Sequence, residues 1–228
     1  MNKDSAIRVI RNALQERRKA LSEYEAKQVL SAYGIPVTRE CLVENKSDVE
    51  KAALKIGYPV VMKGCSSEIA HKTEKGLIHV NIRDSSEALR AYAEIEAGLK
   101  CYSGAVLIQE MVMGSRELAM GLTRDDQFGP CVMFGLGGIF TEILKDISFR
   151  RAPLEERDAL EMMQEIKSNK ILESIRGMEA ANMEILADIL IKLGQIGLEV
   201  EQVREIDLNP VIISHGKPVV ADALMILS

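Results

Sequence analysis

Residues 58–82, YPVVMKGCSSEIAHKTEKGLIHVNI, decide the fold, because two strand signals here enclose a long polar loop. Residues 59–62 form a short apolar run rich in β-branched side chains, which indicates a buried strand ending at Lys63. Residues 77–82 alternate between apolar and polar side chains, as a half-buried strand does. A lysine at the end of a buried strand can pack its stem on apolar neighbours and direct its ammonium at a phosphate. The stretch therefore predicts a strand pair with an anion-binding lysine.

The loop between these strands, residues 64–76, is longer than the two to five residues that a hairpin needs. It contains His71, flanked by Lys72 and Lys75. An imidazole can change its protonation near neutral pH or act as a nucleophile, and nearby cations favour a phosphoryl group on it. The local chemistry leaves two interpretations open for His71, a phosphoryl-carrying side chain and an ordinary solvated loop residue.

The composition is that of a globular protein. The 228 residues include 47% apolar and 28% charged side chains, enough for one domain or two small ones. The net charge of −5 and the lack of a basic run argue against nucleic acid as the main partner. No apolar run is long enough to span a membrane, and the N-terminus lacks the apolar segment of a signal peptide. The cysteines are widely spaced with no CxxC pair, which predicts neither zinc nor disulfides and fits a reducing cytoplasm.

Helix and strand signals alternate along the chain, which predicts an α/β or α+β fold. Residues 4–19 form an amphipathic pattern with Ile7, Ile10 and Leu14 on one face. Ser22 with Glu25 predicts a capping box at the start of a second helix. The helix-rich ends and strand-rich middle indicate two lobes with a cleft between them, joined near residues 109–114.

Two segments of the middle region can contact a nucleotide. The strand at residues 105–109 runs into Glu110 and a linker whose exposed backbone can read adenine; a strand that simply ends at the surface is the alternative. The GLGG run at residues 135–138 can bring backbone N–H groups against a phosphate. It matches neither GxGxxG nor a Walker loop, so a tight turn is the alternative.

Three polar side chains near the C-terminus can hold a metal ion. Alternation along a strand puts Asp207 and Asn209 on one side of the chain, and a following hairpin can return Asp222 beside them. Mg²⁺ accepts two or three such oxygen ligands when nucleotide phosphates complete its shell. Turn formation around Asn209 is the alternative, because Asp and Asn-Pro also favour turns.

Five segments resemble the beta subunit of ADP-forming acetyl-CoA synthetases, which are ATP-grasp proteins related to the nucleotide-binding half of succinyl-CoA synthetase. The resemblance covers residues from about 20 to 224 and implies an α+β ATP-grasp fold with the nucleotide between two α/β lobes. The division expected with it is an N-terminal helix (1–20), an N-terminal lobe with the His71 loop (21–108) and a C-terminal lobe (109–228). The segments are SEYEAKQVLSAYGIPV, YPVVMKGCSSEIAHKTEKG, LIQEMVMGSRE, QFGPCVMFGLGGIFTEILKDISFRRAPL and EIDLNPV.

The resemblance also implies roles for individual residues. His71 matches a histidine that carries a phosphoryl group on a swinging loop, and Asp207 matches the acidic residue that holds the phosphohistidine ring through its distal N–H. The remaining matches concern the nucleotide and its metal: Lys63 on the phosphates, Glu110 and Val112 reading adenine through the backbone, Glu117 on the ribose, and Asn209 with Asp222 on Mg²⁺.

The activity implied is the reversible conversion of acyl-CoA, ADP and phosphate into acid, CoA and ATP, with ATP/ADP and Mg²⁺ as cofactors. The implied partner is a CoA-binding alpha subunit with its own phosphorylatable histidine, in an α2β2 assembly. Two alternatives come from other functional classes. An ATP-grasp carboxylate–amine ligase would need no histidine, and a nucleotide-sensing regulatory domain would bind ATP without transferring its phosphate.

Overall fold

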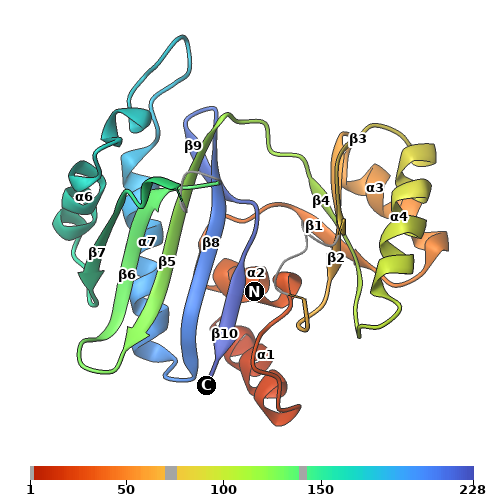
Figure 1. Cartoon of the computed structure of the whole chain (residues 1–228), viewed down its shortest axis with the longest axis horizontal. Coiled ribbons are helices and arrows are strands. Elements are labelled where there is room, and N and C mark those ends of the chain that lie inside the picture. The colour runs from red at the N-terminus through yellow and green to blue at the C-terminus, as the bar shows by residue number, and fades with distance from the viewer. Residues whose placement is uncertain (1–2, 70–75, 139–142) are drawn as a thin grey trace.

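The structure, a computed structural model, describes residues 3–69, 76–138 and 143–228. Two antiparallel sheets lie side by side, each with its own helices (Figure 1). The α+β class and the two-lobed arrangement expected from the sequence are confirmed. None of the helices in the described ranges is both long and apolar enough to cross a membrane.

The smaller sheet has the strand order β1-β4-β2-β3, and all its neighbouring strands are antiparallel. Two helices cover one face of this sheet (Figure 1). Its apolar core runs from Val43 to Ile108. The elements are β1 (Glu40–Val43), a 3-10 turn (Lys46–Asp48), α3 (Val49–Ile56), β2 (Val60–Cys65), β3 (Ile78–Ile82), α4 (Ser85–Leu99) and β4 (Ala105–Glu110).

The larger sheet has the order β10-β8-β5-β6-β7, with β9 paired to β8. Helices α6 and α7 pack against it, and α7 lies behind β5 and β6 in Figure 1. The elements are β5 (Arg116–Asp125), β6 (Gly129–Leu136), β7 (Ile147–Arg151), α6 (Glu156–Glu165), a 3-10 turn (Asn169–Leu172), α7 (Met183–Glu199), β8 (Val203–Ser214), β9 (Lys217–Val220) and β10 (Leu224–Leu227).

The two N-terminal helices, α1 (Lys3–Gln15) and α2 (Glu23–Ala32), belong to the core of the larger sheet. Val29 and Leu30 of α2 are fully buried in the same apolar cluster as Leu118 of β5. The expected N-terminal lobe of residues 21–108 therefore differs from the packing, because α2 contributes its apolar face to the other lobe. Whether the ranges 1–20, 21–108 and 109–228 fold as separate units is a different question, and that division remains a prediction.

Two of the three side chains expected on the apolar face of α1 lie at the core, since Ile10 is buried and Leu14 packs against it. Ala6, Ile10 and Ala13 are buried, whereas Ile7 is 40% exposed. The buried face of α1 combines Ile10 with two alanines and belongs to the same apolar cluster as α2. The capping box at the start of α2 is present as expected, with Ser22 and Glu25 bonded reciprocally.

Strand β8 carries an irregularity where it pairs with β5. Leu118 pairs with Val211 and Met120 with Leu208, so Asn209 and Pro210 together face the single residue Ala119. Such a bulge re-aims side chains and is common beside functional sites.

Candidate nucleotide site

Lys63 lies in the fully buried strand β2 and is 5% exposed. Its Nζ lies 2.8 Å from Glu23 Oε1, 2.9 Å from the Ala221 carbonyl oxygen and 3.6 Å from Asp222 Oδ2. Glu23 comes from α2, whereas Ala221 and Asp222 connect β9 to β10. The ammonium is thus held at the boundary between the two sheets, where a lysine would have to lie to contact a nucleotide bound between them.

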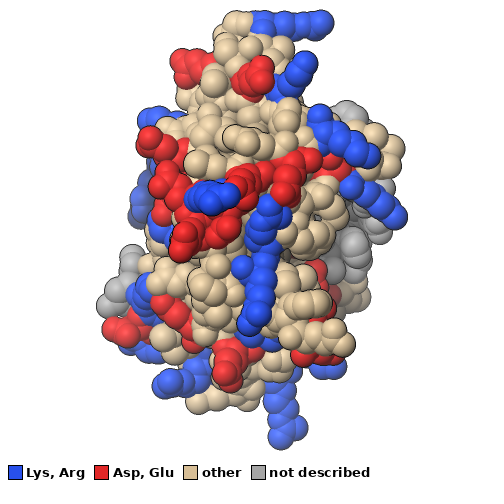
Figure 2. Space-filling view, turned by 90° about the vertical axis from the view of Figure 1, so that its left-hand side faces the viewer, with Lys and Arg blue, Asp and Glu red and all other residues tan. Residues whose placement is uncertain are grey.

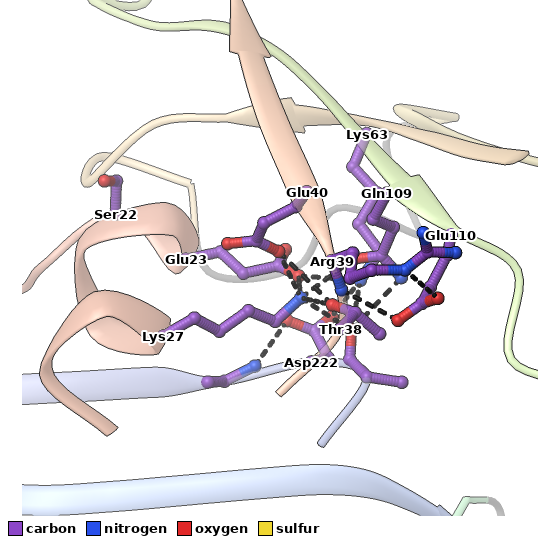
Figure 3. A network of polar contacts seen from close by, with 12 residues as sticks. Ser22, Glu23, Lys27, Thr38, Arg39, Glu40, Lys63, Gln109, Glu110 and Asp222 are labelled. Atoms are coloured by element: carbon purple, nitrogen blue, oxygen red, sulfur yellow. Dashed lines mark hydrogen bonds and ion pairs between the residues drawn. The ribbon is translucent and has the colours of Figure 1, made fainter. Parts of the chain in front are cut away.

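A second buried lysine, Lys27, was not singled out from the sequence. It is 1% exposed, and its Nζ lies 2.8 Å from Glu23 Oε1 and 2.9 Å from Glu40 Oε2. Burial opposes its charge, but the carboxylates of Glu23 and Glu40 outweigh burial and raise the pKa of Lys27. Its ammonium also donates to Thr38, Gln109 and the Ala221 carbonyl (Figure 3).

A sequence signal for this pair did exist. Glu23, Ala26, Lys27 and Leu30 follow the i, i+3, i+4, i+7 spacing of one helix face. A charged pair within an apolar stripe indicates a buried ion pair, since an isolated buried charge is costly.

The structure brings Asp207, Asn209 and Asp222 into one region of the larger sheet. Asp207 pairs in register with Leu224, two residues after Asp222. Burial, then the nearby charges of Glu205 and Asp222, raise the pKa of Asp207 to about 6. The bulge in β8 directs Asn209 toward the end of β6, where its Oδ1 accepts a hydrogen bond from the Gly138 N–H at 2.9 Å.

The GLGG run has a different role from the one expected. The Gly137 N–H donates to the Glu117 carbonyl at 2.9 Å and the Gly138 N–H to Asn209. These two donors are engaged within the protein and do not present themselves to a phosphate. Gly138 has φ +61°, and a methyl group there would overlap the Glu117 carboxylate. Through these two hydrogen bonds the run holds Glu117 and Asn209 in position, which is more than forming a tight turn.

Glu110 and Val112 flank the junction between the sheets. The Glu110 N–H donates to the Arg39 carbonyl, and its carboxylate accepts from the Arg39 side chain at 2.8 Å. In the described part of the chain, the Val112 N–H has no hydrogen-bond partner. Adenine recognition would thus use backbone groups of this linker, while the Glu110 side chain is tied to Arg39. His71 lies outside the described residues.

The oxygen donors of Asn209 and Asp222 fit Mg²⁺, which prefers oxygen ligands and relies on phosphates and water for the rest of its shell. The repulsion between Asp207 and Asp222, which contributes to the raised pKa, is what a cation would relieve. Within the described ranges no three His, Cys, Asp or Glu side chains cluster as a self-sufficient metal site.

Two concavities of the described surface lie elsewhere. One of about 370 Å³ runs along β3 and α4, and one of about 280 Å³ lies between residues 113–116 and 213–216. Neither is lined by Lys63, Asp207 or Asn209. The candidate site is therefore recognised by its converging polar groups and not by its volume.

A buried lysine of the smaller sheet lies near Asp222 of the larger lobe, and a family model described as an ATP-grasp domain matches residues 12–227. The chain therefore belongs to the ATP-grasp class. Relatives across the full length narrow this class. The chain belongs to the family of beta subunits of ADP-forming acetate–CoA ligases. The resemblance seen in the five sequence segments is confirmed, and with it the assignment to a ligase family.

One relative is the ADP-forming acetate–CoA ligase I subunit beta of Pyrococcus furiosus, 45% identical over 96% of this chain and 96% of the relative. Two solved structures of acetyl-coenzyme A synthetase 1 from Ca. Korarchaeum cryptofilum cover 98% of this chain and 100% of theirs. One, described with a phosphorylated phosphohistidine segment in the site I orientation, is 41% identical with a TM-score of 0.88. The other, with Mg-AMPPCP and the phosphohistidine segment pointing towards the nucleotide binding site, is 43% identical with a TM-score of 0.87.

Proposed function

We propose that this chain is the nucleotide-binding half of an enzyme that converts acyl-CoA, ADP and phosphate reversibly into acid, CoA and ATP. The observation that carries the proposal is the position of Lys63, whose ammonium lies between the sheets and faces Asp222 beside Asp207. The full-length similarity to an acetate–CoA ligase beta subunit supports acetate or a related acid as the product.

The nucleotide would lie across the junction of the two sheets. The Val112 N–H and the Glu110 carbonyl would bind adenine, and Glu117 would bind the ribose hydroxyls. Lys63 would offset negative charge on the transferred phosphoryl group, and electrostatic positioning of this kind supplies most of the catalysis in phosphoryl transfer. Asn209 and Asp222 would hold Mg²⁺, which when bound neutralises phosphate charge.

His71 would carry the phosphoryl group between two places. It would accept the group from a phosphohistidine on a CoA-binding alpha subunit and transfer it to ADP. Asp207 would accept a hydrogen bond from the other ring nitrogen and so fix the tautomer. A pKa of about 6 leaves the Asp207 carboxylate ionised above neutral pH, as this acceptor role requires. The two segment orientations described for the Korarchaeum protein support such a movement.

The partner implied is a separate CoA-binding alpha subunit in a cytoplasmic α2β2 assembly. The name of the Pyrococcus relative, a subunit beta, supports a second subunit. Co-purification of the chain with that subunit at equal stoichiometry is the expected result. A chain that remains alone in the presence of the alpha subunit would contradict the proposal.

Phosphorylation of the chain tests the central step. We expect incubation with Mg·ATP and the alpha subunit to label His71 with an acid-labile, alkali-stable phosphate, located by mass spectrometry after an alkaline quench. His71→Ala should abolish the label and the overall reaction. The other two histidines, His79 and His215, serve as controls, because their alanine variants should keep both. Full activity of His71→Ala would point instead to direct acyl-phosphate chemistry and end the proposal.

A further inference from the structure

A buried ion cluster lies around Lys63 between the two sheets, and its other three members have no part in the roles assigned above. It consists of Glu23, Lys27, Glu40 and Lys63, whose side chains are 0%, 1%, 8% and 6% exposed. These residues come from α2, β1 and β2, and Figure 3 shows them converging with Gln109 of β4. Two ammonium groups thus face two carboxylates out of contact with solvent.

We infer that Glu23 is a positioning residue for Lys63, and that Lys27 holds Glu23 in the orientation this requires. One oxygen, Glu23 Oε1, lies 2.8 Å from both Lys63 Nζ and Lys27 Nζ. The inference deepens the proposed function and rests on it, because Lys63 matters for phosphoryl transfer only if the nucleotide lies where we propose.

The surroundings of Glu23 explain why it can hold a flexible side chain in place. Glu23 is the first residue of α2, where the helix dipole favours a negative charge. The capping box of Ser22 and Glu25 fixes this helix end. The lysine side chain is a flexible stem of four carbons, which does not fix the direction of its ammonium group. A carboxylate held in one place therefore decides where the ammonium lies.

The cluster also relates Lys63 to the proposed metal ligand. The Ala221 carbonyl accepts from Lys63 Nζ at 2.9 Å and from Lys27 Nζ at 3.0 Å. Ala221 directly precedes Asp222, so the two ammonium groups hold the backbone that presents this carboxylate. Glu23 and Lys27 therefore fix the position of the proposed phosphate-binding group, Lys63, relative to the proposed metal-binding group, Asp222.

The test is Glu23→Gln, which keeps the shape of the side chain and removes its charge. We expect transfer from Mg·ATP to His71 to slow by about 10- to 100-fold, the effect of a displacement on the order of 1 Å. Affinity for Mg·ATP, measured by calorimetry, should change much less than the rate, because losing the anion beside Lys63 strengthens the attraction of its ammonium for phosphate and offsets the displacement. Glu23→Asp, which keeps the charge but withdraws the carboxylate, should give an intermediate rate.

A readout independent of activity comes from ¹⁵N NMR of the lysine ammonium groups. A buried, hydrogen-bonded ammonium exchanges slowly and gives a signal, which Lys63→Arg identifies by its loss. We expect the Lys63 signal to vanish or shift in Glu23→Gln. The matched control is Glu25→Gln on the same helix, whose carboxylate binds Arg18 at 2.7 Å; it should lower stability but keep the rate and the signal.

The outcomes distinguish a failure of the proposed nucleotide site from a failure of the positioning role of Glu23. If Lys63→Ala transfers phosphate at the wild-type rate, the proposed site fails and Glu23 with it. If Lys63→Ala is inactive while Glu23→Gln keeps the wild-type rate and signal, only the positioning role is overturned. Equal losses in Glu23→Gln and Glu25→Gln would show a merely structural role and overturn it as well. If Glu23→Gln does not fold, a wild-type rate in Glu23→Asp has the same meaning.

Discussion

Lys63 and Gly138 show how single residues define this site. Lys63 has a charge partner before any ligand binds, because Glu23 Oε1 lies 2.8 Å from its Nζ. Gly138 lies opposite, at the end of β6, and combines a left-handed backbone with close approach to Glu117. Both positions depend on groups that are distant in the sequence.

Gly138→Ala tests the second position. We expect nucleotide affinity, measured by calorimetry, to fall at least about tenfold, because the added methyl group displaces Glu117 and strains the backbone that holds Asn209. Gly129→Ala is the matched control. Gly129 also has a positive φ, +74°, but nothing lies within 4 Å of the added atom. Both variants should lose about 1 kcal/mol of stability from backbone strain, and only Gly138→Ala should lose affinity. Equal affinities would refute this account.

At the scale of elements, β7 is the edge strand of the larger sheet and is attached to α6 by charged side chains. Arg150 of β7 binds Glu165 of α6, and Ser148 donates to the same carboxylate. Figure 2 looks onto this side of the molecule, where acidic and basic side chains lie next to one another. Paired charges suit an exposed edge, because they discourage further strand pairing.

The pH dependence of stability tests this attachment. Hydrogen bonds from Arg150 and Ser148 lower the pKa of Glu165 from its ordinary 4.5 to about 2. The folded pKa lies below the unfolded one, so the stabilisation is complete above about pH 4.5 and is lost as the pH falls through about 2. We expect the melting temperature of Glu165→Gln to lie below that of the wild type at pH 7 and to converge with it toward pH 2. Glu201→Gln, in an exposed turn, should show no such gap; a constant gap for Glu165→Gln would contradict the expectation.

At the scale of the whole molecule, the N-terminal helices link the beginning of the chain to its end. Ala20 bridges to Ile226, and the Leu227 N–H donates to the Lys19 carbonyl. Residues 36–38 then run beside Val220 before the chain enters the smaller sheet. The larger lobe is therefore closed by segments from both chain ends, and its stability should depend on α1.

Ile10→Ala measures that dependence. Ile10 is 3% exposed within the core of the larger sheet, so its truncation should cost about 2–5 kcal/mol in the free energy of unfolding. Ile7→Ala on the same helix, at a side chain that is 40% exposed, should cost less than about 1 kcal/mol. Urea denaturation of both variants distinguishes them. Similar losses would mean that α1 does not pack as described.

Local chemistry by itself determined a large part of this protein. Apolar runs and alternation located β2, β3 and β4, and Ser22 with Glu25 located the start of α2, because strand and cap signals act between residues close in the chain. The match of five segments to one family determined its membership. Local patterns alone indicate Lys63 as an anion-binding residue and Asp207, Asn209 and Asp222 as metal-ligand candidates.

Only the tertiary structure decided which distant groups meet. It placed α2 in the larger lobe, engaged the N–H groups of Gly137 and Gly138 inside the protein, and joined Lys27 and Lys63 through Glu23. The physical reason is that burial and charge compensation depend on what packs across the boundary between the sheets. A spacing rule can place Lys27 on the apolar face of a helix. The hydroxyl, carboxylate, amide and carbonyl oxygens that keep it there come from three other segments of the chain, at residues 38–40, 109 and 221.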